Sequence, residues 1–179
     1  RFLEVLGPMH PRLGPVMFQF EYLNKQKMPS RQAFMDVLGA FLDQAPTGFQ
    51  FAVETRNPNY LRQDLLDLLR SHSVALVLVE GYYMPPIREV ADRLDIHTSS
   101  FSILRLLGPD RAKIEERTGG QWNEIVEPKD EGLSATAEIL RQSLRRDVDT
   151  YVNVNNHYEG CAPLTIQRLL TILKQEGAE

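Results

Sequence analysis

The sequence contains a single cysteine, Cys161, and few features that would mark a secreted or membrane protein. One cysteine excludes a disulfide framework within the chain and suits a reducing compartment, so we expect a cytoplasmic protein. Long hydrophobic runs are missing as well, because the longest clean apolar run is VALVLV at positions 74–79. A membrane-spanning helix needs about 20 apolar residues, so we expect no membrane partner.

An excess of basic residues is also absent. The 179 residues include 20 Lys and Arg against 24 Asp and Glu, which gives a formal net charge of −4. A general nucleic-acid binder more often carries a basic excess, so nucleic acid stays a possible partner that the net charge does not indicate. Hydrophobic residues make up 42% of the chain, enough for one sizeable core, and we expect a single domain over residues 1–179. No feature of the sequence specifies an oligomeric state.

Signatures of common cofactor and catalytic sites are missing too. The sequence has no phosphate-binding loop, no G-x-G-x-x-G and no G-x-S-x-G motif. The histidines show no zinc-like spacing; they are His10, His72, His97 and His157. The cofactor therefore stays unknown, and no metal ligands are assigned. Cys161 has no obvious base beside it and is expected to be a small buried residue.

A regular alternation of strand-like and helix-like segments runs along the chain. Apolar or alternating runs predict five strands, at about 15–20, 49–55, 74–80, 101–108 and 150–156. Helices are expected at about 30–42, within YLRQDLLDLLR from residue 60, at 131–146 and at 162–175, with a polar helix-prone segment at 110–125. Ser30 suits an N-cap. One helical face is shared by Leu61, Leu65, Leu68 and Leu69.

This alternation predicts an α/β fold with a parallel sheet covered by helices. A TIM-type (β/α)8 barrel has eight strands and typically about 250 residues, so five units in 179 residues correspond to the later part of one. The opening RFLEVLG resembles the last turns of a helix followed by glycine. We therefore expect an incomplete barrel whose N-terminal units are missing. An open, doubly wound five-stranded sheet is the alternative.

Polar side chains follow every predicted strand, at the end where parallel sheets bind ligands. Glu54 and Arg56 are two residues apart and so point the same way from one strand, and Arg105 interrupts an apolar run and needs a partner, for which Glu54 and Glu80 are the candidates. We predict Glu54 and His157 as catalytic residues. The predicted ligand-binding residues are Gln19, Arg56, Glu80, Arg105, Asn155 and Asn156.

Each of these residues also has a structural interpretation. Arg56 and Arg105 can hold a phosphate or carboxylate, because guanidinium groups bind such anions bidentately, but buried Arg–Glu networks also fill barrel interiors. Asn155 and Asn156 suit turns and helix caps as well as ligands. His157 suits acid–base chemistry near neutral pH or a surface loop.

Four segments resemble one known family in order and spacing. RLGPVMFQF, FAVETRNPNY, ILRLLG and YVNVNNHYEGCAP are similar to the motifs of the YecE-like family, also called domain of unknown function 72. The resemblance implies a TIM-barrel-like fold, usually longer at the N-terminus by about three strand–helix units, of which this chain looks like the C-terminal two-thirds. It implies that the motif positions at the barrel mouth are Glu54, Arg56, Arg105, Asn155 and Asn156. It supplies no established activity.

The chain departs from the family pattern at three places. FEYLN stands where the family usually has a Leu-Pro-Pro-like stretch, and Tyr60 stands where it usually has tryptophan. Leu107 replaces a histidine that usually precedes the glycine of the fourth strand, which puts a shared acid–base activity in question.

Three functions follow from these residues. The first is a TIM-barrel enzyme, of hydrolase or lyase type, that binds a small anionic or phosphorylated ligand at the C-terminal mouth of the barrel. The second is a metal-assisted hydrolase or nuclease that uses Glu54, Glu80 and His157. The third is a non-catalytic binding or scaffold protein whose charge cluster is structural.

Overall fold

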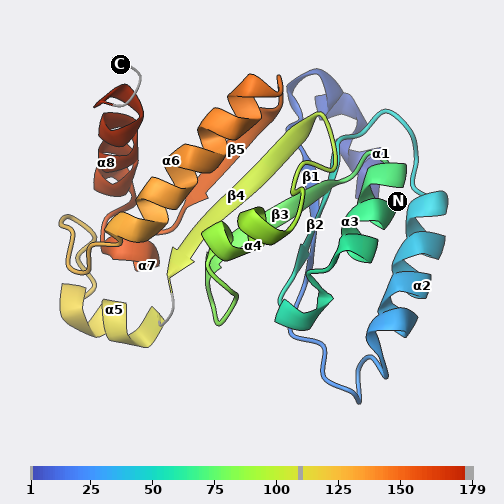
Figure 1. Ribbon diagram of the computed structural model, residues 1–179, viewed down its shortest axis with the longest axis horizontal. Coiled ribbons are helices and arrows are strands. Elements are labelled where there is room, and N and C mark those ends of the chain that lie inside the picture. The colour runs from blue at the N-terminus through green and yellow to red at the C-terminus, as the bar shows by residue number, and fades with distance from the viewer. Residues whose placement is uncertain (1, 109–110, 176–179) are drawn as a thin grey trace.

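The fold is built on a five-stranded, all-parallel β-sheet (Figure 1). The computed structural model describes residues 2–108 and 111–175. Its strands are β1 (Val16–Phe20), β2 (Phe51–Thr55), β3 (Ala75–Gly81), β4 (Phe101–Gly108) and β5 (Asp149–Val154), and they lie side by side in the order β1-β2-β3-β4-β5. All five predicted strands are thus present, and the prediction of an α/β fold with a parallel sheet is confirmed.

Helices follow each strand along the chain. They are α2 (Arg31–Asp43), α3 (Gln63–Ser71), α4 (Ile87–Arg93), α5 (Arg111–Thr118), α6 (Asp130–Arg145), α7 (Asn156–Glu159) and α8 (Ala162–Gln175). Short 3-10 turns at Gly7–Arg12 and Pro58–Tyr60 and the N-terminal helix α1 (Phe2–Leu6) complete the described elements. The sequence did not predict α4 or α7, because segments of seven and four residues are too short to show a helical period. Asp110, in the predicted polar helix, lies outside the described residues.

Local signals at the predicted helices are mostly confirmed. The Ser30 hydroxyl accepts a hydrogen bond from the Ala33 amide at 3.1 Å, as an N-cap does. The leucine face of α3 differs from the prediction. Leu65, Leu66 and Leu69 are its buried positions, whereas Leu68 is only half-buried and Leu61 is buried just before the helix starts.

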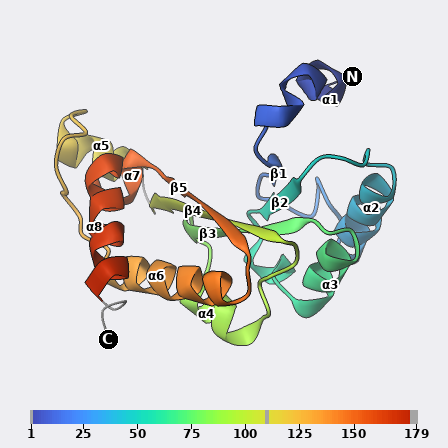
Figure 2. The ribbon, with the colours of Figure 1, turned by 90° about the horizontal axis from the view of Figure 1, so that it is seen from above.

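The two faces of the sheet have different surroundings. One face carries the main core, in which strand residues such as Val53, Leu76 and Leu104 pack against leucines and isoleucines of the helices. Figure 2 shows α2, α3, α4 and α6 on this one side of the sheet. The opposite face holds a smaller apolar cluster drawn from the strands, with Ala52, Ala75, Val77, Val79, Phe101, Ile103 and Leu107 buried in it.

The strand order distinguishes the two predicted architectures. In a doubly wound sheet the order reverses at a switch point and helices cover both faces, whereas here the order follows the chain and the four helices lie on one face. This is the local arrangement of a (β/α) barrel. In the described part of the chain β1 and β5 are not paired with each other, so the sheet is not closed there. No helix among the described residues combines the length and apolar character needed to cross a bilayer.

Candidate functional site

A buried carboxylate lies at the centre of the charged residues that the sequence placed at the strand ends. Glu54, near the carboxyl end of β2, is 0% exposed. Its Oε2 accepts a hydrogen bond of 2.5 Å from Nη1 of Arg105 on β4, and its Oε1 forms an ion pair at 2.6 Å with Nη2 of Arg56. Arg105 Nη1 also donates to Gln19 Oε1 on β1, at 3.0 Å. Sequence positions 19, 54, 56 and 105 thus meet in one place, which we call the Arg–Glu–Arg cluster.

The alternation of side chains along the strands explains this meeting. Gln19 and Glu54 are register partners across the β1–β2 ladder, and Arg105 pairs with Val79 across the β3–β4 ladder. Alternate residues of one strand share a face, so Arg105 emerges beside Ile103 and Leu107, on the face away from the helices. The partner that Arg105 required is therefore Glu54 and not Glu80.

A hollow of about 470 Å³ opens over one side of the cluster. Arg56 lies at its wall with its guanidinium carbon 4.6 Å from the centre of the Tyr82 ring, a cation–π contact. The Arg56 and Arg105 side chains are only 13% and 21% exposed. The hollow is lined by Gln19, Glu21, Tyr22, Arg56, Pro58, Tyr82 and Tyr83.

Glu80 lies on the other face of the sheet. Its Oε2 accepts a hydrogen bond of 2.9 Å from the amide of Ile87 at the start of α4, and burial raises the pKa of its carboxyl. It lines a second hollow, of about 890 Å³, together with residues of α4, the first turns of α6 and Tyr158. The structure therefore separates Glu80 from the Arg–Glu–Arg cluster, and a role of Glu80 in ligand binding stays a prediction.

The two asparagines after β5 act as helix caps. Asn155 Oδ1 accepts from the amide of His157 at 2.9 Å and caps α7, while Asn156 Oδ1 accepts from the amide of Ala162 at 2.8 Å, where α8 begins. The side-chain oxygens of both asparagines thus stabilise the turn of the chain from β5 into α8, in agreement with the interpretation of these residues as helix caps. A further role in ligand binding stays a prediction.

His157 lies on α7 against α5, apart from the Arg–Glu–Arg cluster in all its described contacts. Its Nε2 is 3.4 Å from Glu115 Oε1, and the Trp122 ring meets its imidazole edge-on with centroids 5.0 Å apart. Arg111 donates to the same Glu115 at 2.7 Å, and this hydrogen bond is the main reason why the pKa of the Glu115 carboxyl is lowered. His157 Nδ1 is buried and has no hydrogen-bond partner among the described residues. Its acid–base role stays a prediction.

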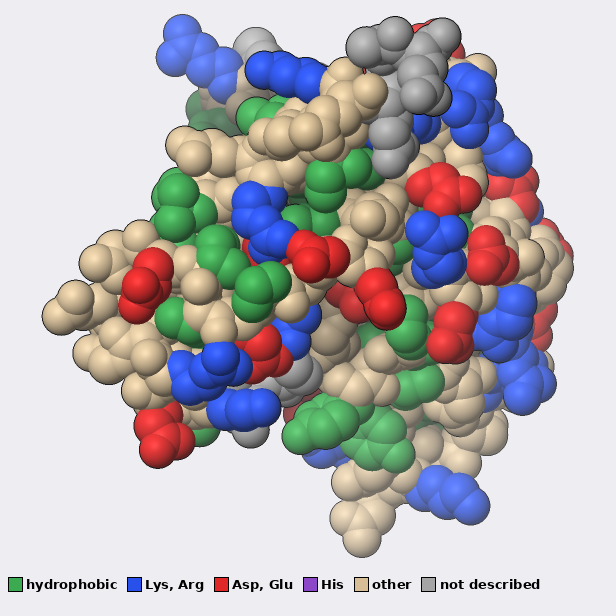
Figure 3. All heavy atoms as spheres, turned by 60° about the vertical axis from the view of Figure 1, so that its left-hand side comes forward, with side chains coloured by type: hydrophobic (Ala, Val, Ile, Leu, Met, Phe, Trp, Pro, Cys, Tyr) green, Lys and Arg blue, Asp and Glu red, His purple; other side chains and the backbone are tan. Residues whose placement is uncertain are grey.

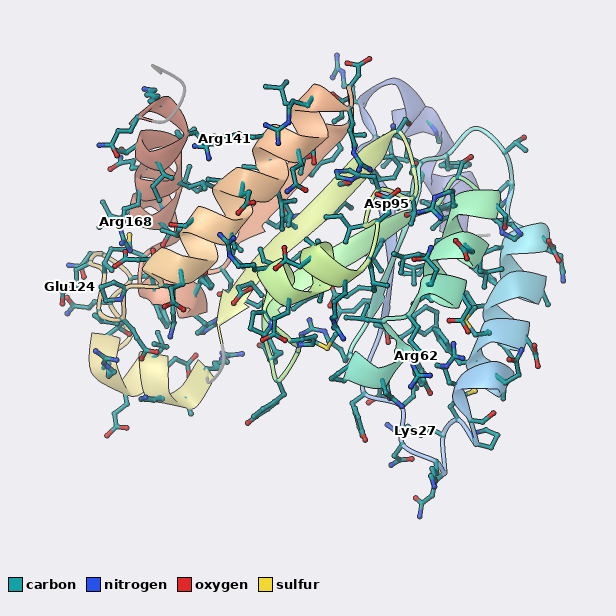
Figure 4. The ribbon with its side chains drawn as sticks, in the orientation of Figure 1. Lys27, Arg62, Asp95, Glu124, Arg141 and Arg168 are labelled. Atoms are coloured by element: carbon teal, nitrogen blue, oxygen red, sulfur yellow. The ribbon has the colours of Figure 1, made fainter. Side chains whose placement is uncertain are left out.

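Sequence reasoning missed the two tyrosines of GYYMPP, which line the hollow over Arg56. It also missed Glu159, a fully buried carboxylate that accepts from the amide of Lys129 at 2.6 Å and pairs with Arg168 of α8 (Figure 4). Cys161 is buried, as expected, and Leu107 packs in the apolar cluster beside Arg105. At position 107, where the family usually has a histidine, this chain therefore has an apolar side chain that packs in the core.

A serine–histidine–aspartate arrangement exists at the opposite end of the sheet. His97 Nε2 lies 2.9 Å from Ser143 Oγ, and His97 Nδ1 lies 3.7 Å from Asp95 (Figure 4). The Ser143 hydroxyl donates to the carbonyl of Ile139 at 3.0 Å and is buried within α6. A nucleophilic serine must instead donate to its histidine, so this group is structural.

The fold and the site define a class: an α/β protein with a parallel five-stranded sheet and an arginine–glutamate–arginine cluster at the carboxyl ends of its strands. The family model described as "Protein of unknown function DUF72" matches residues 1–179, and the chain belongs to this family.

Solved DUF72 structures share the fold. A DUF72 family protein from Thermotoga maritima is 22% identical, with a TM-score of 0.69, and the match covers 97% of this chain and 63% of that one. A DUF72 family protein from Enterococcus faecalis is 17% identical, with a TM-score of 0.62 and 97% and 66% covered. The chain thus spans about two thirds of the length of these structures. No curated protein matches.

Proposed function

We propose that this protein binds a small anionic ligand, with a phosphate or carboxylate group, at the carboxyl-terminal mouth of a YecE-like (β/α) barrel, through Arg56 and Arg105. The observation that carries the proposal is the charge count of the Arg–Glu–Arg cluster. Two guanidinium groups share the single carboxylate of Glu54, which leaves a formal excess of one positive charge. An anion would balance this charge, and guanidinium groups recognise phosphate and carboxylate well.

The surroundings of Arg56 support an anion in the adjacent hollow. Its buried Nε has no hydrogen-bond partner among the described residues, so Glu54 does not use all the donors of this guanidinium. Glu21, an acidic side chain that also lines the hollow, is paired with Lys27 of the β1–α2 loop at 2.6 Å (Figure 4). The local field over Arg56 is therefore favourable to a negative group.

In this proposal Glu54 is a positioning residue. Each of its carboxylate oxygens lies within 2.6 Å of a guanidinium nitrogen, so the carboxylate holds two arginines at a fixed separation instead of accepting a proton from a substrate. Gln19 fixes Arg105 from a third strand. If the protein is a hydrolase or lyase, His157 is the better candidate for proton transfer, because its Nδ1 is unpartnered among the described residues.

The metal-assisted alternative has less support. Glu54 faces two arginines, Glu80 holds the start of α4, and His157 contacts Glu115, so these side chains do not converge. Within residues 2–108 and 111–175 no group of three or more His, Cys, Asp or Glu side chains is arranged to hold a metal ion. A nucleic-acid ligand is not favoured either, because Figure 3 shows basic and acidic side chains interspersed over the face in view.

A thermal-shift titration with inorganic phosphate, sulfate, acetate and citrate tests the proposal. We expect at least one anion to raise the melting temperature of the wild type, since a ligand at 100 times its Kd stabilises by about 2.7 kcal/mol, and to leave Arg56→Ala and Arg105→Ala unshifted. Arg88→Ala is the matched control, because Arg88 is 49% exposed and pairs with Glu138 on the helix side.

Two results would count against anion binding at this site. If every variant shifts with the wild type, the anion binds elsewhere. If no anion shifts the wild type, while Arg105→Met lowers its stability, the cluster is a structural network and the scaffold interpretation holds.

A further inference from the structure

Two tyrosine rings stand largely in solvent around the hollow over Arg56. Tyr83 is 89% exposed and Tyr22 is 63% exposed, and both line this hollow with Tyr82, which is 38% exposed. Scattered exposed aromatic residues are common on protein surfaces, but these three lie around one cavity beside a cationic cluster. Exposed rings that line one cavity are surfaces for stacking a ligand.

The backbone that carries Tyr82 and Tyr83 is strained. Their φ angles are 52° and 61°, in the left-handed region that is unfavourable for residues other than glycine. The turn is held by hydrogen bonds from the Tyr82 amide to the Gly108 carbonyl, at 3.2 Å, and from the Met84 amide to the Gly81 carbonyl, at 3.1 Å. The backbone conformation of Tyr83 therefore destabilises the fold, and its exposed ring makes almost no packing contacts that would offset this.

The turn begins at Gly81, which lies directly against the end of β4. Gly81 has a φ of 109°, and a Cβ at this position would lie 2.6 Å from the Gly108 carbonyl oxygen. This close approach fixes where the two tyrosines emerge. Packing in the fold does not explain why tyrosine, and not glycine, occupies position 83. Backbone strain that packing does not offset is characteristic of functional sites.

The position of Arg56 indicates which ligand these rings suit. Its guanidinium stacks on the Tyr82 ring, so an anion held by Arg56 lies beside the tyrosines, and the remainder of the ligand lies among them. A volume of about 470 Å³ is within the range of small-molecule sites. We propose that the ligand is a phosphate monoester whose organic part contains a ring. This ring, either a sugar or a nucleobase, stacks on Tyr22 and Tyr83. This inference rests on the proposed anion site.

Isothermal titration calorimetry of the whole chain with four probes tests the inference. The probes are inorganic phosphate, glycerol 3-phosphate (acyclic), ribose 5-phosphate (a sugar ring) and adenosine 5′-monophosphate (a sugar and a base). We expect at least one ring-bearing ester to bind about tenfold more tightly than glycerol 3-phosphate, the size of effect that one aromatic stack provides.

The variants separate the two proposals. Tyr83→Gly should lose this tenfold preference, keep its affinity for inorganic phosphate and melt at or above the wild-type temperature, because glycine relieves the strain. Arg56→Ala should lose both affinities. Tyr151→Ala is the control, because Tyr151 is 42% exposed on β5 and does not line the hollow.

Each outcome decides one claim. If inorganic phosphate binds but the ring-bearing esters bind no more tightly than glycerol 3-phosphate, the ring inference is overturned and the anion site stands. The same holds if Tyr83→Gly keeps the full preference. If no phosphate compound binds, the inference fails; the anion site then stands only if a carboxylate such as citrate binds the wild type and not Arg56→Ala, and fails if no anion binds. A preference for adenosine 5′-monophosphate over ribose 5-phosphate assigns the ring as a base, and equal affinities assign it as a sugar.

Discussion

Replacing Glu54 with glutamine should weaken the fold strongly and make its stability depend on added anions. The substitution keeps the size of the side chain and removes the one negative charge that lies between Arg56 and Arg105. Both guanidinium groups then stay in place, only 13% and 21% exposed, with a neutral amide between them. An anion from solution would be the remaining means of neutralising them.

The expected loss follows from the two contacts of the carboxylate, at 2.5 and 2.6 Å. Breaking a buried ion pair by removing one partner costs roughly 3–5 kcal/mol. Because the arginines keep partial access to water and glutamine can still accept a hydrogen bond, we expect the lower end, about 3 kcal/mol. For a chain of this size that corresponds to about 6–12 °C in melting temperature.

Urea denaturation with and without phosphate measures both effects. Glu54→Gln should lose about 3 kcal/mol at an unchanged m-value, and phosphate should restore more stability to the variant than it adds to the wild type. Glu138→Gln is the control, because the Glu138–Arg88 pair is nearly half exposed on both sides and should be worth less than about 1 kcal/mol. A Glu54→Gln variant as stable as this control, or one on which phosphate has no effect, would refute the reasoning.

Two further substitutions test the surroundings of the site. Gly108→Ala should destabilise by about 3 kcal/mol in urea denaturation, because φ is +79° and the new Cβ would lie 2.2 Å from the His157 carbonyl oxygen, whereas Gly14→Ala, with nothing within 4 Å, should be neutral; equal effects would contradict the close packing of α7 on β4. Glu80→Gln keeps the acceptor for the Ile87 amide and removes a carboxyl whose folded-state pKa burial raises above 4.5. The contribution of that carboxyl to stability is full below pH 4.5 and is lost as the pH rises through the folded-state pKa. The stability of the variant relative to the wild type should therefore increase as the pH rises from 4.5; a difference that stays constant with pH would contradict it.

The strands could be predicted from the sequence because their apolar runs are long and clearly bounded. FSILRLLG coincides with β4 at both ends, and its internal arginine correctly indicated a buried partner. The face on which a polar residue emerges could not be predicted in the same way. The first five residues of β3 are all buried, so alternation does not reveal which side of VALVLVE points to the helices, and the sequence left both Glu54 and Glu80 as partners for Arg105.

The rest of the site depends on features that a sequence does not show. The asparagines after β5 are caps because the chain turns at once into α7 and α8, a path that the residue types alone leave open. The positions of Tyr82 and Tyr83 depend on left-handed backbone at two residues that ordinarily avoid it. The ion pairs of Glu54 with Arg56 and Arg105 were the exception, because charge and strand spacing together point to them.

The most direct measurement is the arginine side-chain Nε–Hε spectrum of the 15N-labelled protein during a titration with phosphate. Arg56→Lys and Arg105→Lys variants assign the two resonances. The account predicts that both resonances move together and saturate, ahead of those from exposed arginines such as Arg88. If the Arg56 and Arg105 resonances stay in place while others move, or if none moves at saturating phosphate, the claim that this cluster is an anion-binding site is contradicted.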